Sequence, residues 1–149
     1  MSLLEDRAQI VETLMRYVHG VDSGDMALVR DAFWPDATDS YPGFYEGAVA
    51  EVLPVIEAMR KRLHSMQTML SNISIEVAGS SAKSEALSIC HHRYLHEGSE
   101  YEYVTIGRYI DRHERRAGIW KIGRRERRLD SQRVAHIVQT SPPSSLLQV

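Results

Sequence analysis

The sequence contains very little cysteine and no long apolar run, and each absence excludes a class of protein. Its 149 residues include a single cysteine, Cys90, which rules out an internal disulfide framework and any zinc site built from several cysteines. No stretch approaches the roughly 18 apolar residues that a membrane-spanning helix needs. The opening segment MSLLEDRAQIVETLM carries acids where a secretory signal carries positive charge. We therefore expect a cytoplasmic protein without membrane contacts.

The sequence also lacks the motifs of common cofactor and nucleophile chemistries. It contains no glycine-rich phosphate loop, no dinucleotide-binding fingerprint and no serine or cysteine nucleophile motif. None of its seven histidines forms a pair at the two-residue spacing that chelates a metal on one strand. His92 and His96 would lie about 13 Å apart on an extended chain, too far to share an ion. We therefore expect neither a metal nor another cofactor.

What remains is the composition of an ordinary globular domain, with 43% hydrophobic and 26% charged residues. Folding buries roughly 70% of the surface of a chain of this length, enough for a core and an enclosed pocket. The charges are unevenly distributed along the chain, although the net charge is only −2. Residues 1–60 carry 4 basic and 11 acidic side chains, whereas residues 101–149 carry 10 basic and 5 acidic ones. The arginines alternate with apolar and acidic residues and lack grouped aromatic partners, so we expect no nucleic-acid binding.

The first half of the chain has the apolar spacing of amphipathic helices. Apolar residues at three- and four-residue intervals predict three helices, over residues 3–18, 24–33 and 48–66. Asp22 or Ser23 is a suitable N-cap for the second helix. The acidic stretch 35–47, which contains prolines and glycines, predicts a loop or short extended pieces.

After residue 72 the apolar period changes to two, which predicts strands. Four strands joined by short turns are expected, over residues 72–77, 82–96, 101–110 and 119–129. Helices followed by a meander predict an α+β fold, with three N-terminal helices packed on a strongly curved, mainly antiparallel four-stranded sheet. Such a cone encloses an interior pocket for a small apolar ligand. Residues 1–137 would form this single domain, and residues 138–149 a flexible tail.

Three groups of short segments occur in a familiar order along the chain. They are Tyr17–Asp25 with Phe33–Ala37, Met69–Ile75, and Gly107–Arg112 with Gly118–Ile122. Together they resemble the SnoaL-like family of the nuclear transport factor 2-like (cystatin-like cone) superfamily, over roughly residues 5–133. The resemblance implies the cone fold. Related members include dehydratases, isomerases, polyketide cyclases, dehydrohalogenases, dioxygenase small subunits and non-catalytic carriers, so the fold leaves the function open.

The resemblance also implies candidate catalytic residues. In the dehydratases of this family, a Tyr and an Asp at the offset of Tyr17 and Asp22 line the cavity and act with a histidine from the first strand. That histidine commonly precedes the strand Asn by four positions, and the residue four before Asn72 is Thr68. A threonine is not a general base near neutral pH. The chain therefore departs from the family pattern at its most important position.

An imidazole base would have to come from another position. His64 lies four residues before Thr68, and His91 and His92 are adjacent on a predicted strand, so that one of them should face the cavity. The alternation of side chains along the strand does not decide which of the two histidines faces the cavity. We take Tyr17, Asp22, His92 and His64 as the candidate catalytic residues. The residues expected to line the pocket are Phe33, Trp34, Tyr45, Thr68, Asn72, Tyr109 and Trp120.

Several of these residues also have ordinary structural explanations. Tyr17 fits an apolar helix stripe, Asp22 fits a helix cap, and His113 reads as a surface residue. Our first hypothesis is a cofactor-independent lyase or isomerase with dehydratase-type acid–base chemistry on a small, cyclic, apolar substrate. The alternative is a ligand-binding or accessory protein that has lost the catalytic histidine, and a third is a purely structural dimer module. In each case we expect a homodimer.

Overall fold

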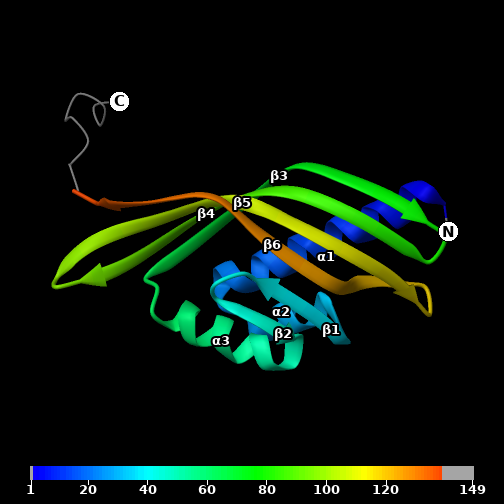
Figure 1. Cartoon of the computed structure of the whole chain (residues 1–149), viewed down its shortest axis with the longest axis horizontal. Coiled ribbons are helices and arrows are strands. Elements are labelled where there is room, and N and C mark those ends of the chain that lie inside the picture. Colours follow the sequence, from blue (N-terminus) through cyan, green and yellow to red (C-terminus); the bar gives the residue numbers. More distant parts are fainter. Residues whose placement is uncertain (1, 139–149) are drawn as a thin grey trace, which may run out of the picture.

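The structure, a computed structural model, describes residues 2–138 and consists of three helices on one face of a six-stranded sheet (Figure 1). The helices are α1 (Leu3–Ser23), α2 (Met26–Asp31) and α3 (Val49–Lys61). The strands are β1 (Phe33–Tyr41), β2 (Tyr45–Ala48), β3 (Ser65–Ala78), β4 (Ser81–His96), β5 (Ser99–Arg116) and β6 (Ile119–His136). They lie in the order β2-β1-β6-β5-β4-β3, and all neighbours are antiparallel except β1 and β6. The predicted tail, 138–149, lies outside the described residues apart from Val138.

The predicted α+β class is confirmed, but the predicted sheet is wrong in two respects. It has six strands rather than four, and it is not strongly curled. The additional strands β1 and β2 come from the stretch predicted as a helix end and a loop. β1 has no simple apolar alternation because one of its inward side chains is Asp39, which is 1% exposed. None of the helices in residues 2–138 has the length and apolar character that crossing a membrane requires.

The helix boundaries also differ from the prediction around Gly20. α1 continues through Gly20, where an added Cβ would lie 2.7 Å from the backbone nitrogen of Val29, so the glycine lets α2 pack closely against α1. α1 ends at Ser23 and is followed by its cap, Gly24, whose φ of 80° is in the left-handed region. The N-cap of α2 is Asp25 and not Asp22 or Ser23. The Asp22 carboxylate is therefore left for another partner.

Bulges in the sheet determine which side chains face the helices. In β6, Trp120 and Ile122 point inward, and an extra residue at Gly123 then shifts the register so that Arg125 and Arg127 point inward instead. β3 has a similar irregularity between Ser71 and Ser74. Asn72 lies in it with a φ of 51°, a conformation that asparagine tolerates better than most residues. A strictly alternating pattern therefore predicts the wrong face for part of each strand.

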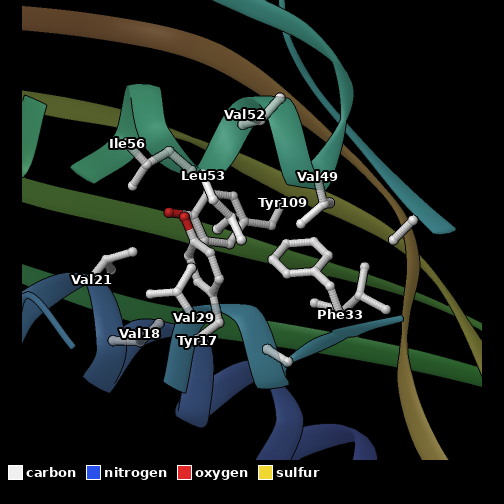
Figure 2. Close-up of a cluster of buried hydrophobic side chains, with 13 residues drawn as sticks. Tyr17, Val18, Val21, Val29, Phe33, Val49, Val52, Leu53, Ile56 and Tyr109 are labelled. Carbon is white, nitrogen blue, oxygen red and sulfur yellow. The ribbon is translucent and has the colours of Figure 1, made fainter. Parts of the chain in front are cut away.

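The main core cluster lies between the sheet and the helices (Figure 2). Tyr17 packs edge-on against Phe33 and Tyr109, with ring centroids 5.8 and 5.9 Å apart. A second cluster contains Trp120, whose indole nitrogen donates to Asp6 at 2.8 Å. The fully buried Tyr17 ring is thus part of the core.

The bulge beside Gly107 provides a test of this description. A Cβ on Gly107 would lie 2.1 Å from the carbonyl oxygen of Arg128, which is backbone and cannot turn aside. We expect Gly107→Ala to lower the free energy of unfolding by about 1–3 kcal/mol, measured by urea denaturation. Gly123→Ala is the control, because its closest neighbour is the flexible end of Glu114, at 2.9 Å. Equal losses in the two variants would contradict this account.

The prediction that His113 is a surface residue is wrong. The side chain is 1% exposed, and its Nε2 lies 2.8 Å from the hydroxyl of Ser84. Burial lowers the pKa of His113 from 6.5 to about 4. Since the folded state resists protonation, the unfolded state binds more protons between these two values, and stability falls as the pH drops through that window.

We expect this histidine to make the protein sensitive to mild acid. Its contribution is complete above pH 6.5 and falls by about 2 kcal/mol between pH 7 and pH 5, as the unfolded chain takes up the proton. Urea denaturation at the two pH values measures the loss. His113→Gln should flatten the pH dependence, whereas His19→Gln, at an exposed position, should leave it unchanged. A His113→Gln slope equal to that of the parent would exclude His113 as the cause.

Candidate functional site

A cavity of about 270 Å³, here called the inner cavity, lies between the end of α1, the side of α3 and the inner face of β4–β6. A cavity of ~150 Å³ is enough to hold benzene, so this volume suits a ligand of one or two rings. Most of the wall is apolar or aromatic, as is usual for small-molecule sites. The polar side chains in the wall include Tyr17, Ser88, Cys90, His92, Tyr103, Thr105 and Arg127.

The structure places His92, and not His91, on the inner face. His92 shares this face of β4 with Cys90 and is 8% exposed, whereas His91 lies on the opposite face with its Nδ1 3.0 Å from Glu102. The Nδ1 of His92 lies 3.0 Å from the carbonyl oxygen of Tyr103. A carbonyl only accepts, so Nδ1 carries the proton and, in the neutral ring, Nε2 holds the lone pair. Burial lowers the pKa of His92, which favours the neutral, basic form.

Asp22, in the last turn of α1, is bound to Thr68 rather than to an imidazole. The backbone nitrogen and the hydroxyl of Thr68 each donate to the carboxylate at 2.8 Å. The Thr68 oxygen also lies 3.1 Å from the sulfur of Cys90, which in turn lies 3.3 Å from the Nε2 of His92. A carboxylate, a hydroxyl, a thiol and an imidazole thus form a continuous chain of contacts. Asp22 reaches His92 only through two intervening side chains.

The proton positions in this chain follow from what each group can accept. The single hydroxyl proton of Thr68 goes to Asp22, so the Cys90 thiol is the donor to Thr68 or to the neutral ring of His92. Burial raises the pKa of Cys90 to about 11, so the thiol keeps its proton at neutral pH. Cys90 is therefore a weak hydrogen-bond donor in the cavity wall and not a thiolate nucleophile.

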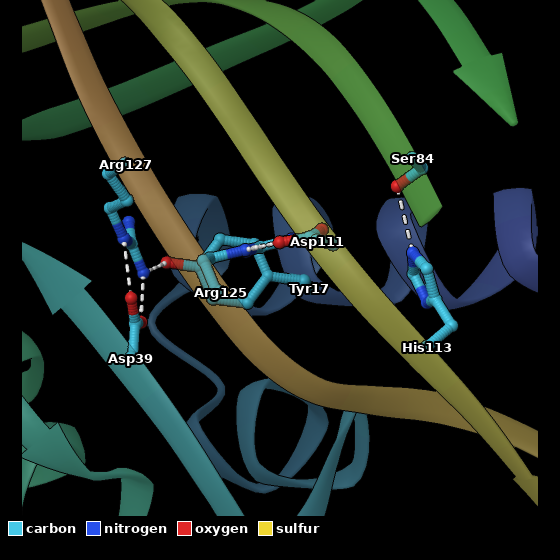
Figure 3. A network of polar contacts seen from close by, with 7 residues as sticks. All are labelled: Tyr17, Asp39, Ser84, Asp111, His113, Arg125 and Arg127. Atoms are coloured by element: carbon cyan, nitrogen blue, oxygen red, sulfur yellow. Dashed lines mark hydrogen bonds and ion pairs between the residues drawn. The ribbon is translucent and has the colours of Figure 1, made fainter. Parts of the chain in front are cut away.

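A buried arginine, Arg127, forms another part of the wall. Figure 3 shows its polar contacts. Arg127 donates from Nε and Nη2 to Asp39 at 3.2 and 2.6 Å, and Nη2 also donates to the hydroxyl of Tyr17 at 2.6 Å. Although burial alone would lower the pKa of Arg127, Asp39 keeps it well above its ordinary value. These contacts do not use Nη1 of Arg127 or the phenolic proton of Tyr17, so both can be donated to a ligand.

A second buried ion pair supports the first (Figure 3). Arg125 donates to both carboxylate oxygens of Asp111, at 2.8 and 2.6 Å, and both side chains are fully buried. Its guanidinium carbon lies 4.2 Å from the ring centroid of Tyr17 and 4.3 Å from that of Tyr109. This stacking holds the two tyrosine rings against the sheet.

The other residues singled out from the sequence lie at varied distances from this cavity. Tyr45 and Tyr109 line it, and Thr68 lies behind Cys90. His64 is exposed in the turn before β3, and Asn72 is exposed at the bulge. The remaining three belong to other parts of the fold. Phe33 and Trp34 border a separate hollow beside α2, and Trp120 belongs to the second core cluster.

Arg127, Asp39 and Tyr103 are site residues that the sequence reasoning missed. Arg127 lies in the run Arg124–Arg128, which has the pattern of a solvated basic surface. Only the bulge in β6 reveals that Arg125 and Arg127 point inward. In the part of the chain that the structure describes, no group of three or more His, Cys, Asp or Glu side chains is arranged to hold a metal ion.

Comparison with known proteins identifies the family. The model of the SnoaL-like domain matches residues 2–126, so the chain belongs to the SnoaL-like family. No curated protein matches the chain in sequence.

Solved structures from several bacteria have the same fold. A Novosphingobium aromaticivorans protein provisionally named scytalone dehydratase has a TM-score of 0.79 at 22% identity, with 93% of each chain covered. A hexachlorocyclohexane dehydrochlorinase, LinA-type3 from Novosphingobium barchaimii, has a TM-score of 0.78 at 20% identity, covering 94% of this chain and 97% of that one. A Streptomyces avermitilis protein provisionally named a dehydratase of the NTF2-like family has a TM-score of 0.73 at 13% identity, covering 85% and 97%. The resemblance predicted from the sequence is confirmed.

The buried ion pair in the wall leads to a stability prediction. We expect Asp39→Asn to lower the free energy of unfolding by about 3–5 kcal/mol, because it leaves the buried charge of Arg127 without a counter-ion. Asp31→Asn is the control. It removes the charge of Asp31, which is 53% exposed and pairs with Lys121 and Arg16, and should cost about 1 kcal/mol or less. Thermal and urea denaturation measure both, and a small loss for Asp39→Asn would mean that Arg127 is not held by this pair.

Proposed function

We propose that this protein is a cofactor-independent lyase or isomerase that acts on a small, apolar, cyclic molecule. The observation that carries the proposal is His92, a buried, neutral imidazole in the wall of a largely apolar cavity, with its ring oriented by the carbonyl of Tyr103. Tyr17 and Arg127 supply hydrogen-bond donors in the same cavity. A base, a donor acid and a dry pocket are what proton abstraction next to a leaving group requires.

In the proposed reaction, Nε2 of His92 removes a proton from a ring carbon of the substrate. The electrons of that C–H bond form a double bond to the neighbouring carbon, whose bond to the leaving group breaks. The phenolic proton of Tyr17 goes to a leaving oxygen, or Nη1 of Arg127 stabilises a leaving anion. The thiol of Cys90 gives way easily when substrate approaches Nε2, because S–H is a weak donor. Names of structurally similar proteins that include a dehydratase and a dehydrochlorinase support this class of reaction.

We expect His92→Gln to reduce kcat/KM by at least about 100-fold, since a positioned base contributes roughly 10²–10⁴-fold. Turnover of cyclic β-hydroxyketones, followed by the absorbance of the conjugated product, and chloride release from chlorinated cyclohexanes are suitable assays. The acid limb of the parent pH profile should fall at a pKa below 6.5, because burial lowers the pKa of His92. His64→Gln is the matched control and should keep full activity, since His64 is exposed in the turn before β3. Full activity in His92→Gln would exclude this histidine as the base.

The position of Thr68 favours a second candidate function. Because Asp22 is bound by Thr68 and not by an imidazole, a protein that only binds its ligand is consistent with the geometry. Saturable binding without turnover across the same compounds would favour this alternative. A homodimer and a cytoplasmic location stay predictions from the sequence.

A further inference from the structure

A second space lies next to the inner cavity, on the other side of His92. This space, here called the outer hollow, has a volume of about 300 Å³ and is bounded by Met59, Leu63, His92, Tyr94, Tyr103 and Val134. Three of these residues, Met59, His92 and Tyr103, also line the inner cavity. Met59, Leu63 and Tyr94 in turn border a surface groove between α3 and the end of β4. The inner cavity, the outer hollow and the surface groove therefore adjoin one another in that order, and His92 lies between the first two.

The partition between the two spaces is fixed on the side of the sheet and adjustable on the side of the helix. His92 and Tyr103 are opposite one another on β4 and β5, with ring centroids 5.4 Å apart. The imidazole bonds to the Tyr103 carbonyl, and the Tyr103 hydroxyl donates to Gln132. Met59 contributes the helix side with an unbranched thioether that can change rotamer to fit a ligand. A molecule that extends from one space into the other would displace the side chain of Met59, while His92 and Tyr103 stay in place.

The outer hollow is apolar and partly exposed to water. Met59 is 40% exposed and Val134 is 58% exposed, so the hollow is open to solvent on this side. Tyr94 stacks on Tyr101 with ring centroids 5.8 Å apart, which presents a fixed aromatic wall. Covering such a surface with an apolar group is favourable, whereas a charged group would lose its hydration there without a partner.

We propose that the outer hollow is a second subsite, which holds the apolar alkyl or aryl tail of an elongated substrate whose ring occupies the inner cavity. This inference rests on the proposed function, because it places the reacting carbon beside His92 at the junction of the two spaces. The substrate class becomes narrower: a cyclic hydroxy or halo compound with an apolar tail, larger than the inner cavity alone can hold.

Binding of 4-alkylphenols by the full chain tests the proposal without requiring turnover. Phenol, 4-ethylphenol, 4-butylphenol and 4-hexylphenol serve as probes, titrated by calorimetry. We expect each added methylene to tighten binding about threefold to fourfold until the tail fills the outer hollow. Affinities that do not change with tail length would overturn the subsite.

Two substitutions at exposed positions locate the effect. Val134→Trp fills the outer hollow and should abolish the gain from the tail while leaving the affinity for phenol itself unchanged. Ile119→Trp is the matched control, because Ile119 is 52% exposed beside the β5–β6 turn, outside both spaces. A full gain from the tail in Val134→Trp would place the tail elsewhere and reject the proposal.

A third substitution shows where the ring binds. Ser88 lines the inner cavity and does not border the outer hollow, so Ser88→Leu should weaken the binding of all four phenols by a common factor without changing the gain per methylene. If longer tails no longer tighten binding in this variant, the ring does not bind in the inner cavity with its tail in the outer hollow. Since every readout is binding, the loss of the proposed enzymatic activity and the loss of the subsite are separate outcomes.

Discussion

Arg127 joins three parts of the chain that are remote in sequence. It extends from β6 to Asp39 on β1 and to the hydroxyl of Tyr17 on α1. Burying an unpaired guanidinium costs several kcal/mol, so the inward turn of Arg127 is stable only with Asp39 beside it. The ion pair thereby links β1 to β6, and the two strands pair in parallel, an arrangement that a meander of hairpins does not produce. The ion pair that secures the added strand also forms the polar wall of the cavity.

The fold could be predicted from the sequence in those segments where apolar residues recur at a regular spacing. The helix stripes and the alternation after residue 72 indicated the α+β class, and β4 was predicted to within one residue of its observed start. Bulges do not appear in a periodicity, because a single extra residue such as Gly123 reverses the faces without changing the composition. β1 was missed for a related reason. Its inward Asp39 is stabilised by a charge on another strand, which no local pattern contains.

The candidate site, too, could be predicted where it depends on local sequence and could not be predicted where it depends on contacts between distant parts of the chain. The family resemblance and the spacing of Tyr17 and Asp22 indicate these two residues as site candidates. For the base, the sequence leaves three candidates, which are His64 and the adjacent pair His91 and His92. The choice of face required the register with β5, where His92 is opposite Tyr103. The partner of Asp22 could not be predicted either, because a carboxylate at a helix end can accept equally well from an imidazole or from a threonine.

Because Thr68 is bound to Asp22, the proposed base, His92, has no carboxylate in direct contact, and this affects its strength as a base. A carboxylate that binds an imidazole raises the pKa of the imidazole. The group that binds His92, however, is the neutral carbonyl of Tyr103. Burial then dominates, and the pKa of His92 falls despite the weaker opposing effects of the carbonyl and the more distant Asp22. A weaker base requires a more acidic C–H bond or stronger stabilisation of the developing negative charge. Arg127 can stabilise the developing negative charge, because its own charge is buried and its Nη1 is not used by Asp39 or Tyr17. The arginine that links β1 to β6 can therefore assist the proposed base, His92, which has no carboxylate in direct contact.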